Sequence, residues 1–172
     1  ILQLSLGGPT SSSTLENAVE YANKNGATVV AAAGNSGPCT NCVGYPAAYN
    51  ESIAVAATNY SDMQATYSSQ GPEVDIAAPG TAISSTVLDG GYSSLSGTSM
   101  AAPFVSGTIA LLKSREPELS NSEVQDILYG TTEELGLSIN ESGNGLIDTE
   151  AATNELDFYI TVESPRNTSY RN

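Results

Sequence analysis

The chain has 172 residues, enough for one domain with a substantial core, and its charge is strongly acidic. Lysine and arginine together number 5 against 19 aspartates and glutamates, which gives a formal net charge of −14. This charge argues against nucleic acid and anionic membranes as partners, because both would repel the protein. No apolar stretch of the sequence is long enough to span a bilayer, so we expect no membrane insertion.

Strand and helix signals alternate from the first residue onward. Residues 1–5 are mostly apolar and predict a buried strand, so we expect the chain to begin inside a larger domain. A helix follows, with Ser13 and Glu16 at the spacing of a capping box, and Gly26 closes it. Residues 28–33 then predict a fully buried strand. Further short strands are expected at residues 52–57, 74–77 and 83–87.

This order of buried strands and helices predicts an α/β fold in which helices cover a parallel sheet. From Ser99 to about residue 113, apolar and small residues occupy nearly every face, which indicates a helix buried through the middle of the domain. We place Pro103 in its first turn, where proline is tolerated. A second helix follows, with Ser120 and Glu123 as its capping box.

Cys39 and Cys42 lie in a loop flanked by glycine and proline. A zinc site would need about four ligands, and the sequence has no histidine and no second pair of cysteines. A local disulfide is the favoured interpretation, with free thiols and redox or metal chemistry as alternatives. A disulfide would indicate an oxidising environment, and four Asn-x-Ser/Thr motifs point the same way. We therefore expect an extracellular or cell-surface protein.

Ser99 is the main candidate for chemistry. At the first turn of a helix, its oxygen lies near unpaired backbone donors and the positive end of the helix dipole, which favour developing negative charge. The ordinary alternative is a helix cap, the role of most serines that precede helices. A serine hydroxyl also needs an adjacent base to become a good nucleophile, and the sequence contains no histidine.

Several motifs, in the same order along the chain, resemble those of the subtilisin-like serine proteases. Residues 97–103, Gly-Thr-Ser-Met-Ala-Ala-Pro, resemble the nucleophile motif, and residues 32–35, Ala-Ala-Gly-Asn, resemble the oxyanion segment. Residues 5–8, Ser-Leu-Gly-Gly, resemble the strand edge that pairs with the substrate. Residues 44–46, Gly-Tyr-Pro, resemble the floor of the primary specificity pocket. Further family motifs occur at residues 69–72 and 77–80.

The resemblance implies a serine endopeptidase that hydrolyses peptide bonds through an acyl-enzyme on Ser99, with Asn35 and the Ser99 amide as oxyanion donors. A peptide or protein substrate would bind by strand addition, with one pocket selecting an apolar side chain. The residues implied in substrate binding are Ser5, Leu6, Gly7, Ala32, Ala33, Gly34 and Gly44. The resemblance implies no cofactor for this chemistry.

The resemblance also implies that the catalytic histidine and aspartate precede Ile1. We therefore expect the 172-residue chain alone to be inactive, with the N-terminal half of the same protease domain as its partner. In isolation, an uncovered sheet edge would leave it oligomeric or poorly folded. Residues 1–155 would form the C-terminal portion of a subtilisin-like three-layer domain, and residues 156–172 a linker or the start of a following module.

Calcium is a further expectation drawn from the resemblance. The family's usual calcium loop would lie upstream of this chain. A weaker structural calcium site could use the carbonyls of Ala47 and Tyr49 with the carboxylate of Asp75. The alternative is that Asp75 belongs to a solvated acidic surface.

Two other functions stay open at this point. The chain could belong to a non-catalytic peptide-binding domain that has lost its base, a pseudoprotease. It also resembles, less closely, the sedolisin-type carboxyl serine proteases, which share the Gly-Thr-Ser nucleophile. That group places an aspartate where Asn35 stands, and strongly acid optimal activity would be its signature.

Overall fold

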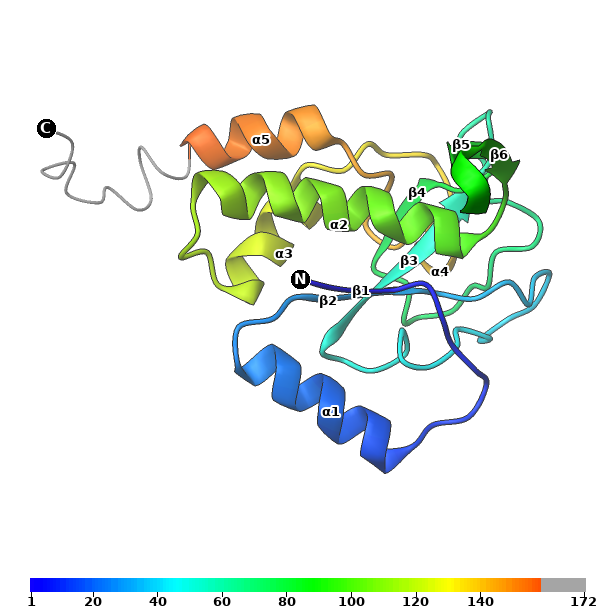
Figure 1. Ribbon diagram of the computed structural model, residues 1–172, viewed down its shortest axis with the longest axis horizontal. Coiled ribbons are helices and arrows are strands. Elements are labelled where there is room, and N and C mark those ends of the chain that lie inside the picture. Colours follow the sequence, from blue (N-terminus) through cyan, green and yellow to red (C-terminus); the bar gives the residue numbers. More distant parts are fainter. Residues whose placement is uncertain (159–172) are drawn as a thin grey trace, which may run out of the picture.

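A four-stranded parallel sheet forms the centre of the computed structural model, which describes residues 1–158 (Figure 1). The strands follow one another in chain order across the sheet. They are β1 (Leu2–Leu4), β2 (Val29–Ala32), β3 (Ser52–Thr58) and β4 (Ile76–Pro79). β2 and β3 are buried along their whole length, as expected for parallel strands covered on both faces. The predicted α/β class, a parallel sheet flanked by helices, is confirmed.

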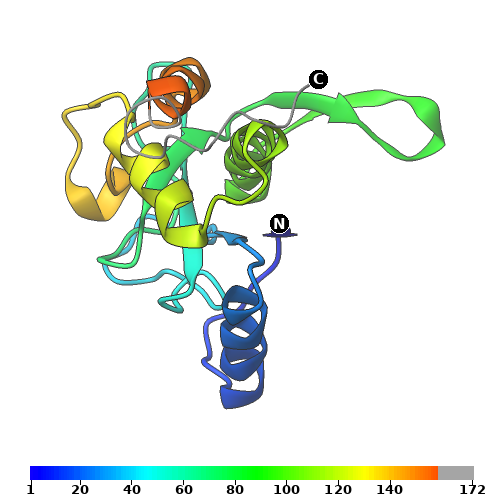
Figure 2. The same ribbon diagram turned by 90° about the vertical axis from the view of Figure 1, so that its left-hand side faces the viewer.

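Helices lie on both sides of this sheet (Figure 1). α1 (Ser13–Lys24) covers one side, while α2 (Thr98–Arg115), α3 (Asn121–Gly130) and α5 (Thr149–Phe158) lie on the other. A short helix, α4 (Ile139–Ser142), precedes α5. β5 (Ile83–Thr86) and β6 (Tyr92–Leu95) form an antiparallel hairpin around the short helix η1 (Leu88–Gly90), and Figure 2 shows it extending away from the body. No helix within residues 1–158 is long and apolar enough to cross a membrane.

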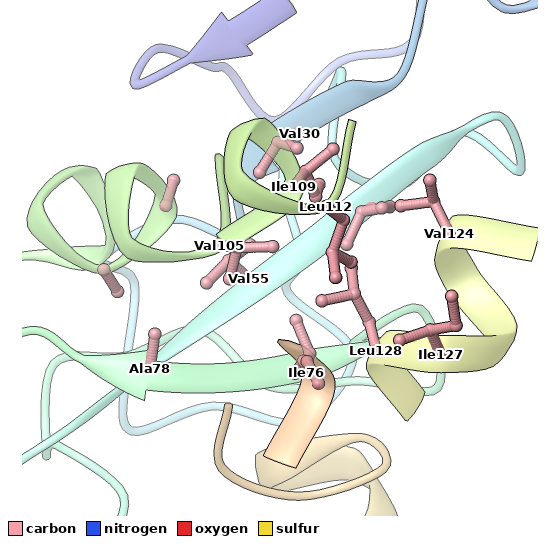
Figure 3. Packing of buried hydrophobic residues seen from close by; sticks show 14 of the residues in the cluster. Val30, Val55, Ile76, Ala78, Val105, Ile109, Leu112, Val124, Ile127 and Leu128 are labelled. Atoms are coloured by element: carbon pink, nitrogen blue, oxygen red, sulfur yellow. The ribbon is translucent and has the colours of Figure 1, made fainter. Parts of the chain in front are cut away.

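The core follows from the alternation of side chains along each strand. Val30, Val55 and Ile76 point from successive strands toward α2 and α3, where Figure 3 shows them packed against the side chains of these helices. The neighbouring Val29 points to the opposite side and packs against Val19 of α1. Two core layers therefore hold the sheet, and its buried strands give the site a rigid support.

Residues 1–5 contain the predicted strand, but it is an uncovered edge of the sheet, as expected for this chain taken alone, and is not buried. β1 pairs with β2 alone, so within the described chain its other edge carries no strand. As a result Ile1 and Leu2 are 45% and 44% exposed. Apolar composition predicted the strand itself correctly, but burial depends on a neighbour on each side.

Two predictions about helix starts also need correction. Ser12, rather than Ser13, is the N-cap of α1, and its N–H donates to the Tyr49 hydroxyl at 2.9 Å instead of entering a capping box with Glu16. Pro103 lies five positions after Thr98, inside α2 and beyond its first turn. The capping box of α3, by contrast, is confirmed, with Ser120 and Glu123 bonded reciprocally.

Within the described chain, the helix after Ser99 is buried on its sheet side but not on every face. Phe104 and Leu111 of α2 are 43% and 49% exposed, because nothing in the described chain covers this face of the helix. Ile109 and Leu112, on the sheet side, are fully buried. The predicted linker is only partly described: Leu156 is buried in α5, and residues 159–172 lie outside the described part. The boundary at 155 therefore stays a prediction.

Candidate active site

The candidate site lies where the parallel strands end. Ser5 directly follows β1, and Gly34 lies two residues beyond β2. α2 starts at the same edge, because Gly97 donates its N–H to the Gly80 carbonyl, just after β4, at 2.9 Å. A side chain at Gly80 would lie 2.9 Å from the Gly97 carbonyl oxygen, so this close approach requires glycine. Ligand sites of open α/β sheets typically lie at this edge.

Ser99 follows Thr98, the first residue of α2. The Ser99 N–H lies in the first helical turn, where main-chain amides have no partner within the helix. The Ser99 hydroxyl donates to the carbonyl of Ser5 at 3.4 Å, and the side chain is half-buried. The sequence has no histidine that could serve as a base for this hydroxyl.

Asn35 is held beside Ser99 by Thr98. The Asn35 Oδ1 accepts the Thr98 N–H at 3.0 Å and the Thr98 hydroxyl at 3.1 Å. Since both Thr98 groups donate, the oxygen of the amide must face them, which turns Nδ2 the other way. Thr98 also accepts the N–H of Gly34 at 3.1 Å, so one buried threonine joins the end of β2 to the start of α2.

Thr98 is a site residue that sequence reasoning missed. Its place directly before Ser99 in the nucleophile motif was the available signal. Its partner Asn35 is 63 positions away, so the hydrogen bonds could not be read from local spacing.

A cavity of about 380 Å³ opens between these elements. Its lining includes all the predicted site residues but one: Ser5, Leu6, Gly7, Ala32, Gly34, Asn35, Gly44 and Ser99. Ala33 is the exception, because side chains alternate along extended backbone and its own is fully buried. The Ala33 carbonyl nevertheless accepts the Gly44 N–H at 2.8 Å, so its main chain supports the cavity wall.

The segment at Gly44 closes the cavity between its two walls. Gly44 bonds to Ala33 on one side, and Tyr45 exchanges two main-chain hydrogen bonds with Gly8 on the other, at 2.8 and 2.9 Å. A Cβ on Gly44 would lie 3.2 Å from the Gly8 carbonyl oxygen. Glycine at position 44 therefore lets the two walls meet closely at the end of the cavity.

The predicted disulfide between Cys39 and Cys42 is confirmed. Cys42 lines the cavity, and its N–H donates to the carbonyl of Gln70 at 2.9 Å. The loop of the disulfide is thus tied to the wall by a main-chain hydrogen bond as well as by the covalent link.

Asp75 is half-buried and hydrogen-bonded to the main chain, so it does not belong to a solvated acidic surface. Its Oδ2 accepts the Ala54 N–H at 2.7 Å, and burial raises the pKa of Asp75 from 3.8 to about 6, although this hydrogen bond favours the ionised form. The Tyr49 carbonyl, another expected calcium ligand, accepts the Ser52 N–H at 3.0 Å. Within the described residues, no group of three or more His, Cys, Asp or Glu could hold a metal. The expected calcium site is therefore not confirmed and stays a prediction.

Solved structures assign this parallel α/β sheet, with a serine at the start of its buried helix, to the subtilisin-like class of folds. A protease of Pseudoalteromonas arctica PAMC 21717 superposes with a TM-score of 0.82 and 34% identity, over 90% of this chain and 51% of that one. Sphericase superposes with a TM-score of 0.79 and 36% identity, over 84% of this chain and 55% of its own.

The sequence comparisons identify the family. Residues 1–164 match the Subtilase family, and the chain belongs to it. It is 46% identical to subtilisin E of Bacillus subtilis (strain 168) over 154 residues, which are 88% of this chain and 40% of that protein. It is 45% identical to subtilisin Savinase of Lederbergia lenta over 153 residues, 89% of this chain and 56% of the relative. The chain thus spans about half the length of the relatives it matches.

Proposed function

We propose that this chain carries the nucleophile and the oxyanion donors of an extracellular serine endopeptidase. The observation that carries the proposal is the fixed pair of Ser99 at the start of α2 and the Asn35 amide that Thr98 orients. The match to the Subtilase family favours this function over the sedolisin-type alternative.

The chemistry proceeds by acyl transfer. The Ser99 oxygen attacks the carbonyl carbon of the peptide bond while a base takes its proton, and the oxyanion that forms is stabilised by Asn35 Nδ2 and the Ser99 N–H. The proton passes to the leaving amine as the C–N bond breaks, which leaves an ester on Ser99. Water then attacks the ester by the same route and releases the acid. The nucleophile, the base and the oxyanion donors are all protein groups, and the proposed chemistry uses no metal.

The substrate is a peptide held in extended form. Residues 5–7 and 32–34 supply main-chain groups on the two sides of the cavity, which suits recognition by strand addition. The end of the cavity at Gly44 would take one side chain. Ser36 in its lining carries no charge, so we propose an apolar preference.

The base and its orienting carboxylate belong to the N-terminal half of the same domain. Three observations support this partner: the sequence has no histidine, the open edge of β1 exposes Ile1 and Leu2, and the chain spans 40% of subtilisin E. Residues 1–155 would then be the C-terminal portion of the protease domain. The Cys39–Cys42 disulfide supports an extracellular location.

The proposal is tested with a fluorophosphonate probe, which couples to an activated serine. In the whole protein we expect labelling on the peptide that contains Ser99, none in Ser99→Ala, and hydrolysis of a peptide ester with a large apolar side chain. The 172-residue chain alone should not react. Absence of labelling in a folded whole protein would contradict the proposal.

A second candidate is a peptide-binding domain without turnover, and the lack of histidine is the observation that favours it. Calorimetry with a peptide aldehyde and with a simple product peptide separates the two functions. An enzyme should bind the aldehyde far more tightly, because only the aldehyde forms a hemiacetal with Ser99. Equal affinities would favour the binding domain.

A further inference from the structure

Pro103 leaves the carbonyl of Ser99 without its normal helical donor. In an α-helix, each carbonyl accepts the N–H of the residue four positions later. For Ser99 that residue is Pro103, which has no N–H, and which lies inside α2. The carbonyl of the expected nucleophile therefore needs a donor from elsewhere.

Ser5 supplies this donor. Its Oγ donates to the Ser99 carbonyl at 2.7 Å, across 94 positions of sequence. The Gln3 side chain donates its Nε2–H to the same Ser5 Oγ at 2.6 Å. A hydroxyl has one proton, so a donor at its lone pair leaves that proton for the Ser99 carbonyl. Gln3 thus helps to direct the Ser5 hydroxyl toward α2.

The contact runs in both directions. While Ser5 donates to the Ser99 main chain, the Ser99 Oγ donates to the Ser5 carbonyl at 3.4 Å. The segment expected to pair with substrate and the residue expected to attack it are thereby held directly against each other. Nothing in strand addition requires a hydroxyl at position 5, because pairing with a peptide uses main-chain groups alone.

We propose that Ser5 is a positioning residue for the nucleophile, through the hydrogen bond from its side chain to the carbonyl that Pro103 leaves unpaired. This inference rests on the proposed function. The hydrogen bond fixes the first turn of α2 relative to the substrate-binding segment, and with it the Ser99 oxygen. Small displacements of a reacting atom have large effects on rate.

The test compares Ser5→Ala, Ser5→Thr and Pro103→Ala in the whole protein. Loss of one hydrogen bond should slow fluorophosphonate labelling and lower kcat by about 5-fold in Ser5→Ala, with KM changed by less than about 2-fold. Ser5→Thr retains the hydroxyl and should keep both rates. A larger effect on KM than on kcat would contradict a role in positioning.

The decisive comparison is the double variant Ser5→Ala/Pro103→Ala. Pro103→Ala gives position 103 an N–H that can bond the Ser99 carbonyl within the helix, so removing the Ser5 hydroxyl should then slow labelling by less than about 2-fold. Equal losses from Ser5→Ala with and without Pro103→Ala would overturn the proposal.

A matched control is Ser114→Ala, which removes a serine hydroxyl that donates to a main-chain carbonyl, that of Leu111, near the other end of α2 at 2.8 Å. It should not change labelling. The ¹³C carbonyl shift of Ser99 provides a readout independent of activity: it should move in Ser5→Ala and less in the double variant. A wild-type protein that does not react with the fluorophosphonate refutes the proposed function. A ¹³C carbonyl shift of Ser99 that is unchanged in Ser5→Ala refutes this inference.

Discussion

Thr98 fixes the orientation of Asn35 by two hydrogen bonds to the same oxygen, one from its main chain at 3.0 Å and one from its hydroxyl at 3.1 Å. This arrangement predicts that substitutions of Asn35 and of Thr98 lower kcat by different amounts. Asn35→Ala removes the donor and should lower kcat by about 10² to 10³, the range typical for loss of one oxyanion donor in a subtilisin. KM for a peptide substrate should hardly change, and steady-state kinetics measure both.

Thr98→Val keeps the main-chain bond to Asn35 and loses the hydroxyl. We therefore expect a smaller decrease in kcat than for Asn35→Ala. Because the half-buried Gly34 N–H loses its acceptor, the free energy of unfolding should fall by about 0.5–1.5 kcal/mol. Thr98→Ser is the matched control and should restore most of both. A Thr98→Val variant as slow as Asn35→Ala would mean that the hydroxyl, rather than the asparagine, carries the effect.

Two neighbouring leucines of α2 test the core. Leu112 is fully buried, so Leu112→Ala should destabilise the whole protein by about 2–5 kcal/mol. Leu111 is 49% exposed in the described structure. If the N-terminal half of the domain covers this face, Leu111→Ala should destabilise the whole protein by more than about 1 kcal/mol. Urea denaturation measures the free energy of unfolding of both variants. An unchanged value for Leu111→Ala would contradict a partner on this face.

Asp75 predicts a pH dependence of stability. Burial raises the pKa of this carboxyl to about 6 in the folded protein, above its ordinary value of 3.8. Its contribution is therefore fully favourable below pH 3.8 and is lost as the pH rises through about 6, by roughly 3 kcal/mol in total. Asp75→Asn keeps an oxygen that can accept the Ala54 N–H. The free energy of unfolding of this variant should therefore increase relative to that of the wild type as the pH rises from 4 to 8. Parallel pH curves for the two proteins would contradict this.

The same pair of proteins tests calcium at Asp75. If the Asp75 carboxylate belongs to the expected calcium site, added calcium should raise the unfolding midpoint of the wild type more than that of Asp75→Asn. Equal increases in the two proteins would contradict a site at Asp75.

The Cys39–Cys42 disulfide should affect stability only modestly, because the loop that it closes is short. The loss of chain entropy corresponds to about 2 kcal/mol. Since Cys42 lines the cavity, its reduction should raise KM more than it lowers kcat. Cys39→Ser/Cys42→Ser in peptide kinetics measures this, and an unchanged KM would show that the hydrogen bond from Cys42 to Gln70 suffices to hold the wall.

Local signals predicted the fold well. The apolar runs at 28–33 and 52–57 became β2 and β3, and the box of Ser120 and Glu123 starts α3. Burial was harder to predict, because Ile1 and Leu111 are apolar but depend on neighbours that the described chain does not supply.

The candidate site was likewise predicted from the sequence only in part. The resemblance to the family motifs implied that Ser99 and Asn35 meet, and they line one cavity. It could not predict the hydrogen bonds of Thr98 and Ser5, whose partners lie 63 and 94 positions away. Nor did it place Pro103 correctly, because the first residue of a helix is set by main-chain geometry as well as by composition.

The cavity is built from segments that follow β1 and β2 and from the first turn of α2, while the core packs behind them between sheet and helices. Stability and selectivity are thus encoded by largely separate sets of residues. Insertions, deletions and substitutions in the loops around the cavity can therefore change selectivity without disturbing the core. An acidic surface could likewise be acquired for a particular habitat while the interior stayed unchanged.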